Sequence, residues 1–323
     1  MCLFSFSFFV RWFFFCVLKF KTMKTVNSIS GGKTSAYIAV HYPADYEVFS
    51  LVCIDDKECT PKDKSIVDYA NRKLEKLIPK YGEFIATAED DATLKAMMDL
   101  EQYLGREIIW VRGKSFDDVI DTGTPTLLPS WARRYCTEQM KLQPIFEWWF
   151  YEIGEKCNMR IGFRFDEFDR MERFFNNSDP TNFRIPVSCS TRGQRQQKHE
   201  TFNWRFCSFP LVKNAVTKQM VEDYWRQNGY VGGTLFEERR QIEFPIISNC
   251  VGCFHKKPDT LCIMAALHPK KMNWFAMQED KGMGTWLDSK IKYETLIAHS
   301  ENNWIPEMLK ESGAVCDSGG CHD

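Results

Sequence analysis

Apolar residues follow two alternating patterns over the first half of the chain: short runs typical of strands, and longer stretches with helical period. The short runs predict strands over residues 25–30, 46–56, 106–113 and 158–165. The longer stretches predict helices over residues 34–41, 61–82, 91–105 and 115–123, and a further helix that starts near Gln143. Because strands that alternate with helices indicate βαβ units, we expect an α/β fold with a doubly wound, mainly parallel sheet.

The pattern becomes less regular after about residue 170. Residues 176–204 are polar and lack helical period, so we expect a long loop or an insertion with a strand pair there. A helix is expected over residues 217–230, and another after the turn that starts at Cys250. The predicted division is an α/β domain over residues 23–175, a smaller cysteine-containing C-terminal subdomain over residues 176–310, and a flexible tail over residues 311–323.

The first 22 residues differ from the rest of the chain, because they hold eight of its 26 phenylalanines. Arg11 interrupts this run and leaves apolar stretches too short to span a bilayer. The first predicted strand follows almost directly after Met23. We therefore interpret residues 1–22 as an upstream extension outside the fold, with a hydrophobic membrane anchor as the alternative.

Composition narrows the class of protein. The chain has 323 residues, of which 44% are hydrophobic and 26% charged, as expected for a folded domain with a sizeable core. Its 13 cysteines are an odd number scattered over a long chain, unlike a secreted disulfide scaffold, so we expect a reducing, cytoplasmic location. The net charge of -1 gives no overall positive field, which leaves only a local basic patch as a route to nucleic acid.

The stretch Ser30, Gly31, Gly32, Lys33, Thr34 and Ser35 lies between the first predicted strand and the first predicted helix. Two glycines at such a junction let backbone amides point at an anion, and the helix N-terminus adds partial positive charge. The hydroxyls can donate to phosphate oxygens, and Lys33 can supply a point charge. The spacing does not fit a Walker A loop. An ordinary Gly-Gly turn is the alternative.

Five segments, in order, resemble the PP-loop superfamily, and within it the phosphoadenosine phosphosulfate (PAPS) reductase-like family. They span nearly the whole chain from Met23. The first is similar to the PP-loop of ATP pyrophosphatases, whose usual form is Ser-Gly-Gly-x-Asp-Ser. The segments are Ser28–Tyr37, Arg133–Ile145, Ile161–Arg170, Phe209–Trp225 and Asn249–Leu261.

This resemblance implies a Rossmann-like fold of the PP-loop/HUP type that binds ATP or a related adenine nucleotide with Mg²⁺. It further implies an enzyme that cleaves ATP between the α and β phosphates to adenylate an acceptor for sulfur or amine transfer. Asp55 and Asp56 would lie beside the adenine and ribose and hold ribose hydroxyls or magnesium; acids at a helix N-terminus are the alternative. Thr34 departs from the family pattern, because an aspartate tied to Mg-pyrophosphate handling usually stands there.

Charged side chains follow directly on the strand predicted over residues 158–165. Strand alternation would put Arg164 and Asp166 on one side, facing the ligand crevice, and Phe163 and Phe165 on the other. We expect Arg164, Asp166 and Arg170 to act with Lys33 in catalysis, since guanidinium groups suit phosphate recognition. A surface salt bridge is the alternative reading. Lys141 faces either the phosphates or solvent.

Cysteines at a turn predict a metal site. Cys250 and Cys253 form a C-x2-C turn, Cys262 follows on the next predicted helix, and Cys136 lies in a segment that resembles the family's cysteine motif. Four thiolates suit a [4Fe-4S] cluster or a structural Zn²⁺ ion, and the resemblance favours the cluster. His255 can replace Cys262 in a zinc site. Free buried thiols are the alternative.

Two other functions stay open. The first is a sulfonucleotide (PAPS/APS) reductase, in which Cys321 of the tail attacks sulfur and thioredoxin supplies electrons. The second is a non-enzymatic, nucleotide- and metal-binding component of a nucleic-acid-modification or defence system, for which residues 191–200 supply a basic run. The acceptor substrate and sulfur donor are not identifiable from the sequence.

Overall fold

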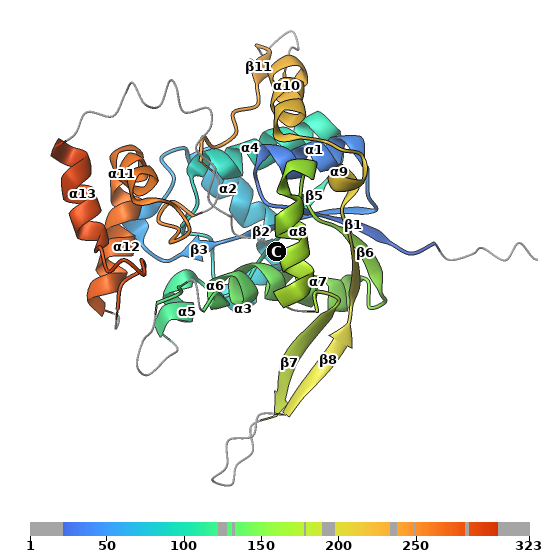
Figure 1. The fold of residues 1–323 in the computed structure, drawn as a ribbon, viewed down its shortest axis with the longest axis horizontal. Coiled ribbons are helices and arrows are strands. Elements are labelled where there is room, and N and C mark those ends of the chain that lie inside the picture. The colour runs from blue at the N-terminus through green and yellow to red at the C-terminus, as the bar shows by residue number, and fades with distance from the viewer. Residues whose placement is uncertain are drawn as a thin grey trace, which may run out of the picture.

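The computed structural model describes residues 22–121, 128–130, 133–177, 179–188, 198–232, 238–247, 250–281 and 284–302. A five-stranded sheet lies at its centre, with strand order β5-β2-β1-β6-β9 and every neighbouring pair parallel (Figure 1). The strands are β1 (Thr25–Ile29), β2 (Tyr46–Leu51), β5 (Ile108–Arg112), β6 (Cys157–Arg160) and β9 (Arg205–Ser208). The predicted α/β fold with a parallel sheet is confirmed.

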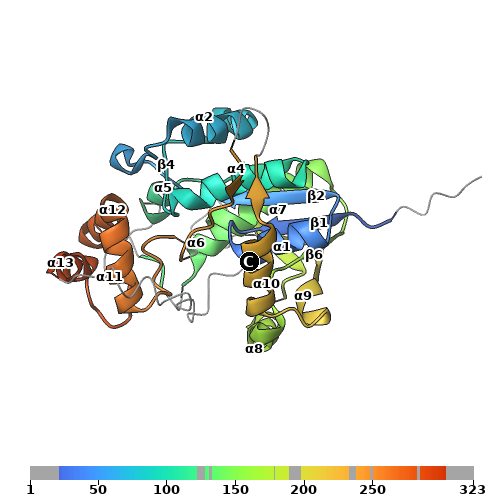
Figure 2. The same cartoon turned by 90° about the horizontal axis from the view of Figure 1, so that it is seen from above.

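Helices cover both faces of the sheet, because successive strand residues point to opposite sides. Phe49 packs on one face with the apolar sides of α1 (Lys33–His41), α2 (Lys64–Lys73) and α4 (Asp91–Leu104). The neighbouring Val48 packs on the other face, against α7 (Gln143–Glu152). Figure 2 shows α4 and α7 with the sheet strands, viewed from above.

A third apolar cluster lies beside the sheet. It is built from the C-terminal helices together with α5 (Phe116–Asp121) and the small antiparallel pair β3 (Cys53–Ile54) and β4 (Ala86–Thr87). The C-terminal helices are α11 (Pro258–Leu267), α12 (Pro269–Lys281) and α13 (Tyr293–Asn302). Figure 1 shows them grouped at one end of the molecule, away from β6.

Several predicted boundaries were wrong. The apolar run over residues 46–56 is two strands, because β2 ends at Leu51 and β3 turns to pair with β4. The helix expected over residues 61–82 starts only at Lys64, after its capping residue Asp63, and is interrupted before α3 (Ile78–Tyr81). The helix expected to start near Gln143 is confirmed as α7, and helical backbone that was not predicted precedes it from Tyr135, through α6 (Tyr135–Thr137) and a π-helical turn.

The strand predicted over residues 158–165 also ends early, at Arg160. Residues 165–167 form a 3-10 turn that leads into α8 (Phe168–Asn177), a helix that the sequence pattern did not indicate. As a result Phe163 is buried at 1% exposure while Phe165 is 51% exposed, so the expected shared face for these two rings was wrong.

The strand pair expected within residues 176–204 is present as β7 (Asn182–Ser188) and β8 (Lys198–Asn203), which are antiparallel. The chain then returns to the central sheet as β9, followed by α9 (Pro210–Lys213), α10 (Lys218–Asn228), and the short strands β10 (Tyr230–Val231) and β11 (Arg240–Gln241). Residues after 175 thus supply both a strand of the sheet and a helix on α1, which the predicted division did not anticipate. That division itself remains a prediction.

Three sequence predictions fall on segments outside the described residues: the N-terminal extension up to residue 21, most of the basic run 191–200, and the tail from residue 311, including Cys321. In the described part of the chain, none of the helices has both the length and the apolar character needed to cross a membrane.

Candidate functional site

The glycine loop joins β1 to the N-terminus of α1, at the carboxyl edge of the parallel sheet where α/β proteins bind ligands. Gly31 has φ +84°, a backbone conformation that side chains rarely adopt. A Cβ atom there would lie 2.2 Å from Cγ2 of Thr93 on α4. Two independent constraints therefore require glycine at position 31, and α4 begins in contact with the loop.

Hydrogen bonds fix the shape of this loop. The backbone N–H of Ser30 donates to Oγ of Ser35 (3.1 Å), whose hydroxyl donates to the carbonyl of Gly32 (3.0 Å). The Ser35 hydroxyl thus bonds within the loop and helps to fix its shape, and its donation to a phosphate oxygen stays a prediction. Ser30 and Lys33 are exposed, and the Lys33 carbonyl accepts a bond from the indole of Trp225 on α10 (2.8 Å).

Arg164 lies beside the loop, because β6 is the parallel neighbour of β1 and the segments that follow the two strands leave the sheet at the same edge. Its Nη1 donates to Oγ1 of Thr34 (3.0 Å). Its Nε contacts Asp166 (3.2 Å) and its Nη1 contacts Glu167 (3.3 Å). The arginine and the loop are therefore brought together, while Asp166 forms the salt bridge that the sequence left as an alternative.

Arg170 lies one turn further along, on α8. It pairs with Glu167, and its guanidinium carbon lies 4.7 Å from the centre of the Phe163 ring. Glu167 thus contacts both arginines, Arg164 and Arg170. This shared carboxylate was not singled out among the expected site residues, although its place between the two arginines in the sequence was a usable signal.

The two acids that end the apolar run 46–56 have different roles. Asp56 caps a 3-10 turn, since its carboxylate accepts the N–H of Glu58 (2.8 Å). Its interactions match the helix-terminal alternative. Asp55 has an exposed side chain, and its backbone N–H donates to the carboxylate of Asp117 (2.8 Å). Burial raises the pKa of Asp117, whereas the hydrogen bonds from the Asp55 backbone and the Trp274 indole lower it.

Three of the four predicted metal-binding cysteines line one small apolar cavity of about 20 Å³. Cys250 and Cys253 belong to a tight turn closed by the N–H of Cys253 on the Cys250 carbonyl (3.1 Å), and Cys136 comes from α6. Cys262 is buried in α11 and does not line this cavity. Among the described residues, no group of three or more His, Cys, Asp or Glu side chains is arranged to hold a metal ion.

The segment from Glu89 to Thr93 connects the cysteine cavity to the glycine loop. Glu89 forms a backbone bridge with Cys250, and four residues later Thr93 meets Gly31. The Glu89 side chain is buried and forms an ion pair with Lys141 (3.2 Å). The Lys141 ammonium therefore points at this carboxylate and is mostly shielded from solvent. The sequence prediction missed both Glu89 and Thr93.

The signal that could have found this segment is its run of three acids before a helix, of which Asp90 is the helix cap.

Comparisons of the chain with protein-family models, with curated proteins and with solved structures found no match.

Proposed function

We propose that this protein binds an adenine nucleotide at the glycine loop and cleaves ATP between the α and β phosphates, adenylating an acceptor. The observation that carries the proposal is the contact between Arg164 and Thr34, which sets a guanidinium against a positive-φ glycine turn at the sheet's carboxyl edge. Backbone amides, a helix N-terminus and a nearby arginine together are what a chain of phosphates requires.

In the proposed reaction an oxygen of the acceptor attacks the α-phosphorus. The bond between that phosphorus and the bridging oxygen to the β-phosphate breaks, and pyrophosphate leaves. The acceptor, now an adenylate, is attacked by a sulfur or amine nucleophile, and AMP departs. Mg²⁺ bound by the phosphates would offset their charge. Catalysis then rests on positioning and electrostatic stabilisation.

The residues have distinct roles in this proposal. The amides of Gly31 and Gly32 hold the phosphates, and the exposed residue Lys33, next in the chain, adds positive charge. Arg164 stabilises the charge that develops on the leaving pyrophosphate. Asp166 orients Arg164 through their 3.2 Å ion pair.

The cysteines fit a metal group in part. Cys136, Cys250 and Cys253 come from two distant segments and line one cavity, and they would be the thiol ligands of a [4Fe-4S] cluster or a Zn²⁺ ion. In their present positions these described side chains do not form a metal-binding group. Cys262, the fourth expected ligand, lies in the same apolar cluster. A bound cluster would supply redox or sulfur chemistry, and a zinc ion would hold the C-terminal helices to α6.

Calorimetric titration of the full chain with ATP and Mg²⁺, together with an assay of pyrophosphate release, tests the proposal. We expect ATP to bind, and Arg164→Gln to lose most of that affinity. The matched control is Arg173→Gln on α8, whose guanidinium bonds a backbone carbonyl of its own helix. Failure of the parent protein to bind ATP, or equal loss in both variants, would overturn it.

A further inference from the structure

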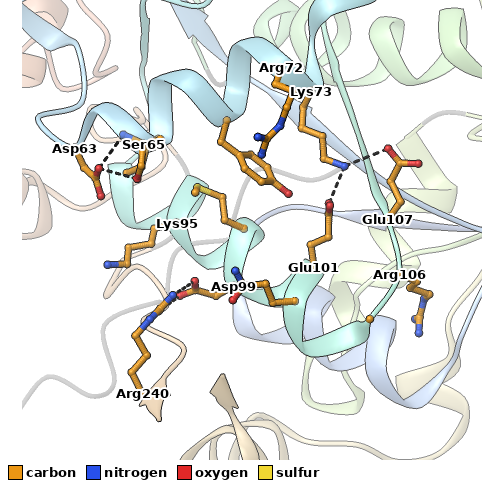
Figure 3. Close-up of a pocket in the computed structure, with 15 residues that line it drawn as sticks. Asp63, Ser65, Arg72, Lys73, Lys95, Asp99, Glu101, Arg106, Glu107 and Arg240 are labelled. Carbon is orange, nitrogen blue, oxygen red and sulfur yellow. Dashed lines mark hydrogen bonds and ion pairs between the residues drawn. The ribbon is translucent and has the colours of Figure 1, made fainter. Parts of the chain in front are cut away.

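A second cavity, of about 680 Å³, lies between α2 and α4, away from the glycine loop (Figure 3). It is lined by both helices, by the turn that follows α4, and by Arg240 from β11. Four carboxylates and five basic side chains line it: Asp63, Asp99, Glu101, Glu107, Arg72, Lys73, Lys95, Arg106 and Arg240. A cavity of this volume suits a small-molecule ligand.

The carboxylates of this cavity already have partners. Glu101 and Glu107 both pair with Lys73, at 2.9 and 3.2 Å. Asp99, whose side chain is only 3% exposed, accepts two bonds of 2.5 Å from Arg240. Figure 3 shows these two sets of ion pairs at different parts of the cavity.

The remaining acid, Asp63, caps α2 by accepting bonds from the backbone and hydroxyl of Ser65 (2.9 and 2.7 Å). Each carboxylate of the cavity therefore has a hydrogen-bond or ion-pair partner, although Lys73 is shared between two of them and Asp63 is held by a neutral serine.

Two cations of the cavity are not neutralised in this way. Among the residues that the structure describes, neither Arg72 nor Lys95 has an ion-pair partner, whereas Arg106 pairs with the buried Glu47 (2.7 Å). Arg72 projects from α2, its guanidinium carbon 4.9 Å from the centre of the Tyr69 ring. Lys95 projects from α4. Each helix thus presents one cation of the cavity that is not held in an ion pair and is available to a ligand.

We propose that this cavity is a second ligand site, distinct from the glycine loop, that binds a small anion carrying phosphate or carboxylate oxygens. Arg72 on α2 and Lys95 on α4 are the cations that would receive it. The apolar side chains of Ile66 and Met98 line the same space and leave room for a carbon skeleton. Charge-assisted hydrogen bonds to both cations give the site its selectivity for anions.

The helix α4 links this site to the loop. Thr93 contacts Gly31, whereas Lys95 and Asp99 on the next turns line the cavity. A ligand that draws Lys95 toward α2 therefore acts on the helix whose first turn contacts the glycine loop. The two sites share one element but no side chain.

Titration calorimetry of the full chain with inorganic phosphate and, separately, with succinate tests the proposal. Phosphate presents its charge on one group and succinate on two, so the two arms distinguish a phosphoryl ligand from a dicarboxylate. We expect one of them to bind, and Arg72→Gln and Lys95→Gln each to weaken that binding about tenfold, the usual loss for one charged hydrogen bond.

A control variant makes the result specific. Lys76→Gln removes one exposed positive charge just beyond α2, outside the cavity, and is expected to leave binding unchanged. Phosphate held at the glycine loop would be unaffected by Arg72→Gln, so only the binding that this variant loses is assigned to the cavity. Binding of neither probe, no loss in Arg72→Gln and Lys95→Gln, or equal losses in Lys76→Gln and Arg72→Gln would overturn the proposal.

Discussion

The guanidinium of Arg164 lies 3.0 Å from the hydroxyl of Thr34, and this bond joins the end of β6 to the glycine loop. Thr34 offers a neutral hydroxyl, so this bond adds no further carboxylate to the two, Asp166 and Glu167, that already pair with Arg164. In the proposed reaction Arg164 meets the phosphates from this position beside the loop.

Thr34→Val tests this relationship, because valine keeps the shape but removes the oxygen that accepts from Arg164. We expect MgATP affinity to fall about tenfold, since a bond to a charged group contributes about 1.5 kcal/mol. Calorimetric titration measures it. Thr201→Val, at an exposed position of β8, is the control. Unchanged affinity in Thr34→Val would show that the bond does not order the arginine.

Gly31→Ala should destabilise the protein by about 2–4 kcal/mol, through the strained positive φ and the overlap with Thr93. Thr93→Ser removes the Cγ2 atom that is overlapped. We therefore expect the double variant to recover part of the loss and to keep about 1–2 kcal/mol of backbone strain. Urea unfolding measures all three variants. Additive losses in the double variant would refute the predicted contact.

Cys250→Ser should lower the metal content of the anaerobically purified protein, because it removes one thiol from the cavity shared with Cys136 and Cys253. Cys207→Ser, on β9 and remote from that cavity, should keep the parent content. Iron, sulfide and zinc analysis with an optical spectrum distinguishes cluster from zinc. A parent protein without metal would remove the basis for this site.

The Glu89–Lys141 ion pair is buried, so removing one partner leaves a charge in a poorly solvated place. We expect Glu89→Gln to cost about 3 kcal/mol of unfolding free energy. Adding Lys141→Met should recover much of it, because both charges are then gone. Denaturant unfolding of the two single variants and the double variant gives the coupling. A double variant as unstable as the sum of the single variants would argue against the pair.

Asp45 ties β1 to the turn before β2, and its pKa is lowered mainly by the hydrogen bond from the Thr25 backbone. A lowered folded-state pKa means that its contribution is complete above the unfolded-state value near 4 and is lost as pH falls through the folded-state value. Asp45→Asn should cost about 1 kcal/mol at pH 7. The difference from the parent should shrink steadily below about pH 4 in thermal unfolding. A difference independent of pH would exclude this carboxylate as the cause.

Elements whose partners are close in the chain were predictable from the amino-acid pattern alone. The alternation of apolar runs with helical segments predicted β1, α1, β5 and α4, because a buried parallel strand and a two-faced helix each need a characteristic spacing. The double glycine predicted the loop, since position 31 requires a backbone that only glycine adopts readily.

The contacts between these elements became visible in the folded structure. The sequence pattern did not place β9 in the central sheet, Thr93 on Gly31, or Glu89 opposite Lys141. Nor did it indicate the cavity between α2 and α4. The physical reason is common to all of them: contacts between distant segments depend on strand order and helix packing. Local propensity and periodicity do not encode these, and they arise when the whole core is assembled.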